Sequence, residues 1–400
     1  MNGISKFLST LITVIFVFST FGIAVFAGSE SSAADINYTV KVCADKGNWF
    51  THPENSLEAI NDCSAEYISL DIRLTADGVP VLLKDETVDR MCTDRNGNAV
   101  SGSVKNINYP VLSTYRLRQR NGGVGSEVSE STVASLQQAL THSDGKTLIL
   151  DTEKSDFDAV YKCVSDNSAQ EKVIFRPNCS AKEAFALAKE KGISNIMAKY
   201  DGNVIFSAVS LIKNSEKNGF LTAQIGSKNQ YGVVFYHAFT KIFNKYNRTV
   251  LFSMTDGYSG KRPDSAEGWD DIISRGYGII ETDYPDSLQN YISESEAIKT
   301  NLRYLKETCN KYKNGSYSKD TASSFEKALA NANGVLGRYA SKNELSKAYS
   351  ELNNAFANLK TDGKITELFS FTPGKIIAAS LCLCAVAAAQ VFFYKRRKSN

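Results

Sequence analysis

Short β-rich apolar runs alternate with amphipathic segments from about residue 37 to residue 292, and this alternation constrains the fold more than any other feature of the chain. The runs that predict strands are YTVKVCA, YISLDIRL, PVLLKD, TLILDT, KVIFRP, GVVFYHA, TVLFSM and GYGIIETD. Segments such as SAKEAFALAKEKG and SAEGWDDIISRG predict helices between them. About eight such units predict an α/β fold with a closed (β/α)8 TIM barrel over residues 38–292. An open, doubly wound sheet is the alternative, although no G-x-G-x-x-G motif follows a strand to support its nucleotide-binding form.

Residues 293–361 carry helical patterns alone. Two apolar stripes have helical spacing, one formed by Phe325, Leu329, Ala332 and Leu336 and the other by Leu345, Leu352, Phe356 and Leu359. The sequence SKNE, at residues 341–344, is a capping box that predicts the start of the last helix. We therefore expect a small three-helix bundle. Its segments SFEKALANANGVL and ELSKAYSELNNAFANL resemble the FIVAR-type module of bacterial surface proteins, which implies a spacer between the barrel and a membrane.

Both ends of the chain have the composition of targeting segments. Residues 1–27 combine a weakly basic start, an apolar stretch and small residues at their end, which predicts a secretory signal peptide, with an uncleaved anchor as the alternative. Residues 375–394 form an apolar run about as long as a bilayer core is thick, which predicts a transmembrane helix. By the positive-inside rule the basic tail at residues 395–400 is cytoplasmic, so we expect the barrel to be extracellular and anchored in the cell membrane.

Composition argues against a nucleic-acid partner and leaves the cysteines undecided. The net charge is only +3 over 400 residues, and no basic stripe is interleaved with aromatic residues. Six of the eight cysteines lie outside the predicted membrane segment, and none is part of a cluster with zinc-ligand spacing. Disulfides and unpaired thiols are both compatible with an exported protein.

Polar residues follow the predicted strand ends, which is where a barrel places its ligand site. They are Asp45, Lys46, Ser69, Asp71, Lys84, Asp85, Asp151, Glu153, Lys199 and Asp283. The segments ADKG, HPENSLEAI, YISLDIRLTADGVPVLLKD, ASLQQAL, LILDTEK and GYGIIETDYP resemble, in order and spacing, the glycerophosphodiester phosphodiesterase family from about Val40 to Ile292. The resemblance implies a TIM barrel, a divalent cation such as Ca²⁺ or Mg²⁺, and hydrolysis of glycerophosphodiesters to glycerol 3-phosphate and an alcohol.

The resemblance places the family's two catalytic histidines at residues that are not histidine here. The first, from a His-Arg-Gly motif, corresponds to Asp45, and the phosphate-facing arginine after it corresponds to Lys46. The second, from a His-Asp pair, corresponds to Lys84. Acid–base catalysis needs a group with a pKa near the operating pH, and lysine is normally a fixed cation, so catalysis is expected to be impaired. Lys46, Lys84 and Glu54 of the retained Pro-Glu-Asn motif are the candidate ligand-binding residues.

The metal-binding carboxylates that the resemblance implies are also incomplete. The family's Glu-x-Asp is Ser69-Leu70-Asp71 here, which leaves Asp71, and its later Glu-x-Lys corresponds to LDTEK, which offers Asp151 or Glu153. A hard divalent cation prefers several anionic oxygens, so a Ca²⁺ or Mg²⁺ site is expected to be weak or absent. The lysines would then hold an anion without a metal. A structural charge network that seals the barrel mouth is an equal alternative.

The chain has three histidines, and His52 is the one nearest to the lost catalytic position. It lies in the same loop, several residues later, and would replace the missing group only if the loop brought it back to the site. Packing beside Trp49 or Phe50 is the alternative. We expect His142 to be exposed, and His237 follows a predicted strand near the barrel mouth.

Three classes of function stay open. The first is an exported, membrane-anchored pseudoenzyme that binds a glycerophosphodiester, a lipid headgroup or a teichoic-acid-like polymer. The second is a divergent phosphoric diester hydrolase that releases glycerol 3-phosphate. The third is a structural surface protein whose barrel is an interaction face. The first is favoured because both histidine positions are replaced.

Overall fold

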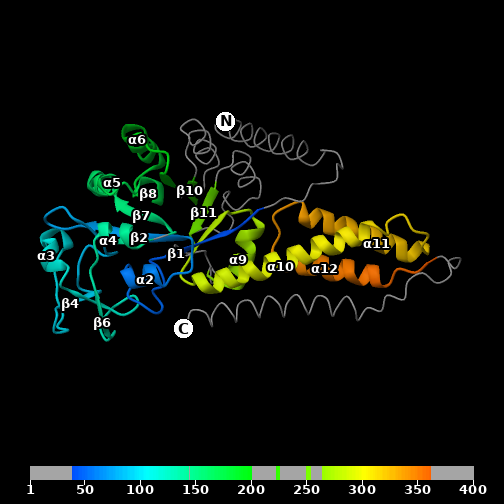
Figure 1. Ribbon diagram of the computed structural model, residues 1–400, viewed down its shortest axis with the longest axis horizontal. Helices are drawn as coiled ribbons and strands as arrows, with labels where there is room; N and C mark the ends of the chain where they lie inside the picture. The colour runs from blue at the N-terminus through cyan, green and yellow to red at the C-terminus, as the bar shows by residue number, and fades with distance from the viewer. Residues whose placement is uncertain (1–37, 144, 201–221, 226–248, 254–263, 362–400) are drawn as a thin grey trace, which may run out of the picture.

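The computed structural model describes residues 38–143, 145–200, 222–225, 249–253 and 264–361, and it shows a barrel joined to a helical bundle (Figure 1). The strands are β1 (Lys41–Asp45), β2 (Tyr67–Leu74), β3 (Pro80–Leu82), β4 (Cys92–Thr93), β5 (Arg116–Arg118), β6 (Val128–Thr132), β7 (Thr147–Glu153), β8 (Val173–Asn178), β9 (Met197–Tyr200), β10 (Thr222–Ile225), β11 (Thr249–Ser253) and β12 (Ile279–Thr282). The helices are α2 (Leu57–Asn61), α3 (Tyr109–Leu112), α4 (Leu136–His142), α5 (Phe157–Asp166), α6 (Ala181–Lys191), α9 (Ala266–Ser274), α10 (Pro285–Asn310), α11 (Lys319–Leu336) and α12 (Lys342–Ala357).

Several predicted features lie outside the described ranges. They are the signal peptide at residues 1–27, the transmembrane helix at 375–394, the basic tail at 395–400, and His237. Within the described ranges, none of the helices combines the length and the apolar character needed to cross a bilayer.

Eight parallel strands form a ring. Their order is β8-β7-β2-β1-β12-β11-β10-β9, and all neighbours on this path pair in parallel. A parallel bridge between Phe175 and Ile196 joins β8 to the segment that leads into β9, so the two ends of the path meet. The α/β, TIM-barrel-like fold that the sequence predicted is confirmed.

The side chains of the ring strands alternate between two environments, as the two-residue period of a strand requires. Outward residues such as Val42, Ile68 and Leu150 belong to the core between strands and helices. Inward residues at the lower level of the barrel form a separate apolar cluster of Cys43, Ile149, Ile174, Met197, Leu251 and Ile279. The next inward position of each of these strands, two residues later, therefore lies above an apolar floor.

One predicted ring strand was wrong, and two ring strands were not predicted. The run PVLLKD contains β3, which pairs antiparallel with β2 and lies off the ring. Strands β9 and β10 were not predicted, because each is only four residues long and lacks a long apolar run. The predicted strand GVVFYHA lies outside the described residues. After β3 the chain forms a subdomain around the antiparallel sheet β4-β5-β6, with its own apolar core at residues 79–133.

Three helices form the predicted bundle, but its boundary with the barrel differs from the expected one. Helix α10 runs without interruption for 26 residues, so the boundary expected at residues 292 and 293 falls inside it. Its first turns pack Leu288 and Ile292 into the barrel core, whereas Leu302 and Leu305 pack into the bundle core. One continuous helix thus contributes to both cores. The predicted capping box at the start of α12 is confirmed.

The bundle contacts the barrel at the N-terminal ends of the strands. Tyr38, just before β1, exchanges hydrogen bonds of 3.1 Å with the backbone of Ala340, and its ring lies 4.5 Å from the ring of Tyr339. Gly276, just before β12, lies so close to Tyr339 that a Cβ would come within 2.9 Å of its ring. The C-terminal ends of the strands, where a barrel carries its site, are therefore at the opposite end of the barrel from this contact.

The six cysteines of the described residues are all free thiols. Cys43, Cys63, Cys92 and Cys309 are buried, and Cys163 and Cys179 are half-buried. The sequence allowed both disulfides and unpaired thiols, and these six cysteines are unpaired.

Candidate functional site

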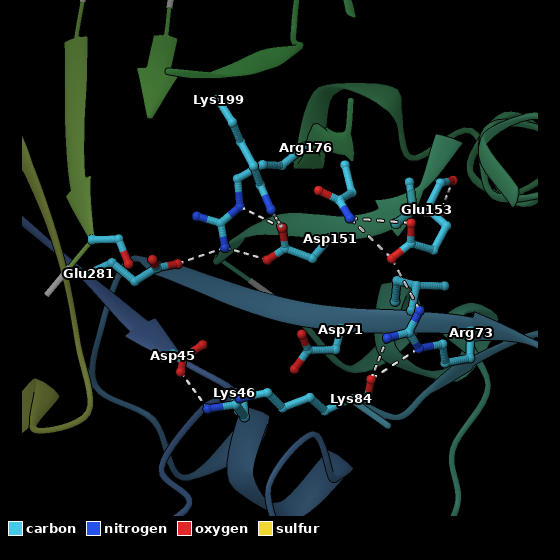
Figure 2. Close-up of a pocket in the computed structure, with 14 residues that line it drawn as sticks. Asp45, Lys46, Asp71, Arg73, Lys84, Asp151, Glu153, Arg176, Lys199 and Glu281 are labelled. Atoms are coloured by element: carbon cyan, nitrogen blue, oxygen red, sulfur yellow. Dashed lines mark hydrogen bonds and ion pairs between the residues drawn. The ribbon is translucent and has the colours of Figure 1, made fainter. Parts of the chain in front are cut away.

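A cavity of about 200 Å³ opens at the C-terminal ends of the ring strands (Figure 2). Its wall carries the inward side chains above the apolar floor, which are Asp45, Asp71, Asp151, Arg176, Lys199, Ser253 and Glu281. Parallel pairing places three of them side by side, since Asp71 is in register with Asp151 and Asp151 with Arg176. These inward side chains, here called the charged layer, lie directly above the apolar cluster, because every second residue of a strand points to the same side.

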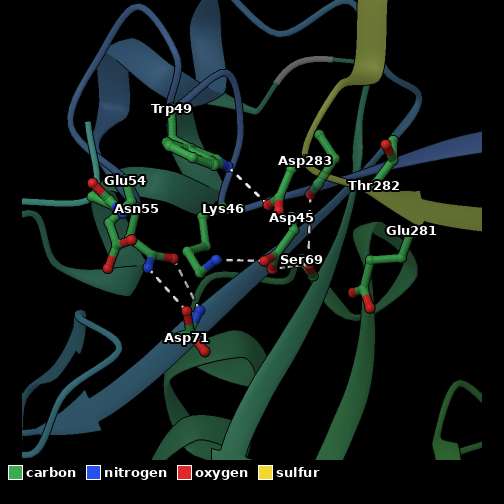
Figure 3. Close-up of polar contacts among 12 residues, drawn as sticks. Asp45, Lys46, Trp49, Glu54, Asn55, Ser69, Asp71, Glu281, Thr282 and Asp283 are labelled. Carbon is green, nitrogen blue, oxygen red and sulfur yellow. Dashed lines mark hydrogen bonds and ion pairs between the residues drawn. The ribbon is translucent and has the colours of Figure 1, made fainter. Parts of the chain in front are cut away.

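Asp45 stands at the first histidine position, and two neighbours hold its carboxylate. The Lys46 ammonium donates to Oδ2, and the Ser69 hydroxyl donates to Oδ1 at 3.2 Å (Figure 3). Burial raises the pKa of Asp45 to about 7, although Lys46 opposes this shift. The pKa of Lys46 is held above its usual range because the charge of Asp45 outweighs the effect of burial. The first histidine position thus carries a carboxyl group that titrates near neutrality.

The loop after β1 holds Asp71 in place. Lys46 and Asn55 both adopt positive φ angles, of 61° and 58°, and the Asn55 amide N–H donates to the Lys46 carbonyl at 3.1 Å. The Asn55 side chain donates to the Asp71 carboxylate and accepts from the Asp71 backbone N–H, both at 3.0 Å. Burial and the nearby charge of Asp151 raise the pKa of Asp71, which this hydrogen bond partly offsets. The asparagine of Pro-Glu-Asn is therefore a scaffold residue.

Glu54 lies outside the cavity lining, which corrects the expectation that it binds a ligand. Its side chain is almost fully buried, and Oε1 accepts from Arg90 Nη2 at 2.5 Å. Arg90 also donates from Nε to Asp85 Oδ2 at 2.5 Å. These contacts connect the loop to the subdomain after β3. The Glu54 carboxylate, which we expected to bind a ligand, is therefore bound to Arg90.

Arg176 is the central cation of the cavity. It is buried, donates from Nε to Asp151 Oδ1 at 2.8 Å and from Nη2 to Oδ2, and its Nη2 lies 2.7 Å from Glu281 Oε1. Lys199 Nζ lies 3.0 Å from Asp151 Oδ1. Burial disfavours ionisation of Asp151, but Arg176 and Lys199 outweigh it and hold its pKa below the usual range. Asp151 is thus an anion whose charge is already compensated by side chains.

Lys84 lies at the second histidine position and lines the cavity with an exposed side chain. Its ammonium has no ion-pair partner in the described part of the chain, whereas its carbonyl accepts two hydrogen bonds from Arg73, at 2.6 and 3.0 Å (Figure 2). Both carboxylates of LDTEK line the cavity. Asp151 is bound by Arg176, and Glu153 is bound by Arg73 at 3.4 Å and by the Asn178 amide at 3.2 and 3.3 Å.

His52 does not reach the cavity. Its ring Nε2 lies 3.2 Å from Asp62 Oδ2, and its backbone N–H donates to the Asn48 carbonyl at 3.3 Å. The loop therefore turns His52 away from the charged layer, and the geometry gives no support to a catalytic role for it. His142 is exposed, as expected.

A divalent cation does not fit the carboxylates of this cavity. Ca²⁺ binds six to eight oxygens, several of them anionic. Here both oxygens of Asp151 accept from cationic side chains, Asp45 is bound by Lys46, and Asp71 is held by Asn55. Among the residues that the structure describes, no group of three or more His, Cys, Asp or Glu side chains is arranged to hold a metal ion.

A model of the glycerophosphoryl diester phosphodiesterase family matches residues 46–208. The chain is thus similar to this family over residues 46–208. Two curated relatives named glycerophosphodiester phosphodiesterase 1, from rat (Rattus norvegicus) and mouse (Mus musculus), are 34% identical over 106 residues. The matched segment is 26% of this chain and spans 30% of the length of those relatives.

The barrel is also similar to the crystal structure of a glycerophosphoryl diester phosphodiesterase from Parabacteroides distasonis. The TM-score is 0.50 at 21% identity, with 66% of this chain and 90% of that chain covered. At this identity the similarity concerns the fold alone. The phosphodiesterase-like fold thus extends past the segment that the family model matches.

Two features of the site were missed from the sequence. Arg176 and Glu281 are charged residues inside the apolar runs KVIFRP and GYGIIETD, which was the available signal for inward polar side chains. The second feature is an aromatic cluster. The ring centroids of Trp49 and Phe50 are 4.3 Å apart, and those of Phe50 and Tyr284 are 4.7 Å apart. Trp49 Nε1 donates to Asp283 at 3.0 Å, which joins the loops after β1 and β12 (Figure 3).

Proposed function

We propose that this protein is an exported, membrane-anchored phosphodiesterase-like barrel that binds a glycerophosphate-type anion and does not hydrolyse it. The observation that carries the proposal is the side chain of Lys84, an exposed cation on the cavity wall without an ion-pair partner among the described residues. The charge of Lys84 acts on Asp71 without a direct ion pair, and an exposed ammonium of this kind favours an anion. The family domain points to the phosphate of a glycerophosphodiester as that anion.

Three further parts of the proposal rest on the sequence. The signal peptide would direct export, and the C-terminal helix would anchor the protein in the cell membrane with the barrel outside. The helical bundle, which we infer to be a FIVAR-like spacer, would separate the barrel from that membrane. The ligand would be a glycerophosphodiester, a lipid headgroup or a teichoic-acid-like polymer, which share the glycerophosphate chemistry.

One assay separates binding from turnover. The purified full-length protein is incubated with glycerophosphocholine and Ca²⁺ or Mg²⁺, and release of glycerol 3-phosphate is measured. We expect no turnover, together with saturable binding of sn-glycerol 3-phosphate that weakens about tenfold in Lys84→Ala. Parallel arms with a soluble glycerophosphate polymer and with vesicles containing phosphatidylglycerol distinguish the two sources of the ligand. If neither turnover nor binding is found, the barrel is a structural or interaction module.

One observation favours the second candidate, a divergent phosphodiesterase. Asp45 has a pKa raised to about 7 by burial, so it has the protonation behaviour that acid–base catalysis requires. Turnover that is lost in Asp45→Asn but kept in His52→Ala would establish this candidate in place of the pseudoenzyme.

A further inference from the structure

Arg176 lies beside the carboxylates that would hold the divalent cation in the glycerophosphodiester phosphodiesterase family. It is in register with Asp151, which is in register with Asp71, and these are the carboxylates that the resemblance assigns to a divalent cation. Its guanidinium lies between Asp151 and Glu281, and it is only 3% exposed. Lys199 adds a second cation on the same Asp151 carboxylate. Two cationic side chains are thus built into the charged layer, where they are paired with Asp151 and Glu281.

We propose that Arg176 and Lys199 replace the divalent cation, so that the cavity binds the phosphate of a phosphomonoester or phosphodiester without a metal. This inference rests on the proposed function and specifies how the same site recognises its ligand. Guanidinium groups suit phosphate oxygens because their N–H donors are fixed in a planar fork.

The hydrogen-bond inventory of Arg176 supports this assignment. Five N–H bonds are available, and Nη1 is buried without an acceptor among the residues that the structure describes. Buried donors are rarely left without a partner in folded proteins. Nη1 is therefore a donor without an acceptor, and a phosphate oxygen is an acceptor of the right charge. Glu281 Oε1, which lies 2.7 Å from Nη2, is also buried without a hydrogen bond.

The same network explains why added metal would not strengthen binding. Arginine cannot lose its proton in a protein, and the charges of Asp151 and Glu281 raise the pKa of Arg176 further, although burial opposes them. A divalent cation placed on Asp151 would therefore face a permanent guanidinium and Lys199. Lys84, across the cavity, would complete the set of cations around the ligand.

The test measures the affinity of the full-length protein for sn-glycerol 3-phosphate and for glycerophosphocholine by isothermal titration calorimetry. Each titration is run in EDTA and again with millimolar Ca²⁺ at matched ionic strength. The variant is Lys199→Met, whose side chain is one-third exposed, so that folding is little affected. The matched control is Lys154→Met, which removes a lysine outside the cavity lining.

We expect the dissociation constant to change less than threefold between EDTA and Ca²⁺. Lys199→Met should weaken binding about tenfold, which corresponds to the loss of one charge-assisted hydrogen bond, and Lys154→Met less than twofold. Tightening of threefold or more by Ca²⁺, or binding that Lys199→Met leaves unchanged, would overturn this inference and leave the proposed function intact. Absence of binding in both buffers would overturn the proposed function itself.

Discussion

At the scale of single residues, the charges of the site differ in how firmly each one is held. Asp151 is ionised because Arg176 and Lys199 outweigh the effect of its burial. Asp45 has a single cationic partner, and burial dominates its ionisation, so its pKa is raised to about 7. Its charge therefore changes across the neutral range, and the stability of the barrel should change with it.

The stability of the protein should fall between pH 5 and pH 8 because of Asp45. Its folded-state pKa of about 7 lies above the ordinary value of 3.8, so the folded protein favours the protonated carboxyl. The stabilising contribution is complete below about pH 4 and is lost as the pH rises through about 7. Relative to Asp45→Asn, the wild-type protein should lose on the order of 2 kcal/mol of unfolding free energy between pH 5 and pH 8.

Urea denaturation at a series of pH values measures this loss. Glu130→Gln, which removes an exposed carboxylate on β6 paired with Arg116, is the control and should keep the wild-type pH dependence. Identical pH profiles for the wild-type protein and Asp45→Asn would show that Asp45 is ionised throughout this range, against the expectation.

Residue-level prediction from the sequence depended on knowing which strand face a side chain occupies. Asp71 could be placed because the family resemblance marks it, whereas the resemblance left open whether Asp151 or Glu153 faces the site. Glu54 was misassigned because the sequence does not show Arg90, which is 36 residues away and binds it in the fold. Lys84 was expected at the site and lines the cavity, but only the structure shows that its ammonium forms no ion pair within the described part of the chain.

At the scale of elements, the loop between β1 and α2 determines the shape of the site. It turns tightly, with Gly47 at φ 78° directly after Lys46. The backbone N–H groups of Lys46 and Asn48 donate to the carbonyls of Ser69 in β2 and Ala59 in α2, both at 2.9 Å. A Cβ at Gly47 would lie 2.7 Å from the Ala59 carbonyl oxygen, in helix α2. Glycine is thus required here both for the backbone conformation and for the close approach of the helix.

Gly47→Ala should destabilise the protein more than Gly78→Ala. The two glycines have nearly equal φ angles, of 78° and 76°, so both substitutions carry a similar conformational cost. Only Gly47 also meets a backbone atom, whereas a Cβ at Gly78 has nothing within 4 Å. We expect Gly47→Ala to cost about 1–3 kcal/mol more, as an overpacked site does, measured by thermal and urea denaturation. Equal losses in the two variants would show that the loop relaxes away from α2.

The order of the elements was largely predictable, because strand and helix periods differ. The eight-unit count led to the right fold although β3 was placed in the ring and β9 and β10 were missed. Strand β3 has the composition of a ring strand, and only its antiparallel pairing with β2 excludes it. The predicted domain boundary at residue 292 was also wrong. It falls inside α10, and the helical periodicity of this segment does not change where the helix leaves the barrel.

At the scale of the whole molecule, one continuous helix joins the bundle to the barrel. Helix α10 is about 39 Å long at about 1.5 Å per residue, and it passes from the barrel core into the bundle core. Asp270 on α9 stabilises the junction through three hydrogen bonds. Its carboxylate accepts from the Tyr291 hydroxyl and the Lys342 backbone N–H, both at 2.6 Å, and from the Asn343 side-chain amide at 2.8 Å. Barrel and bundle should therefore unfold together.

Asp270→Ala should uncouple the two units. Three donors on α10 and α12 lose their acceptor, and a hydrogen bond of this kind contributes about 1 kcal/mol, so we expect a total loss of about 2–3 kcal/mol. The chain offers a direct measurement, since its two tryptophans, Trp49 and Trp269, both lie in the barrel. Tryptophan fluorescence therefore follows the barrel and, through the contact of Trp269 with Tyr291, its junction with α10. Circular dichroism at 222 nm follows the helices of both units.

In the wild-type protein the two signals should change at the same urea concentration, as a single cooperative transition requires. In Asp270→Ala they should separate, because the bundle then melts without the barrel. Glu267→Ala, on the exposed side of the same helix, is the control and should keep the transitions coincident. Coincident transitions in Asp270→Ala would show that α10 and the contact of Tyr38 with Tyr339 suffice to couple the units, and that Asp270 contributes to stability without setting cooperativity.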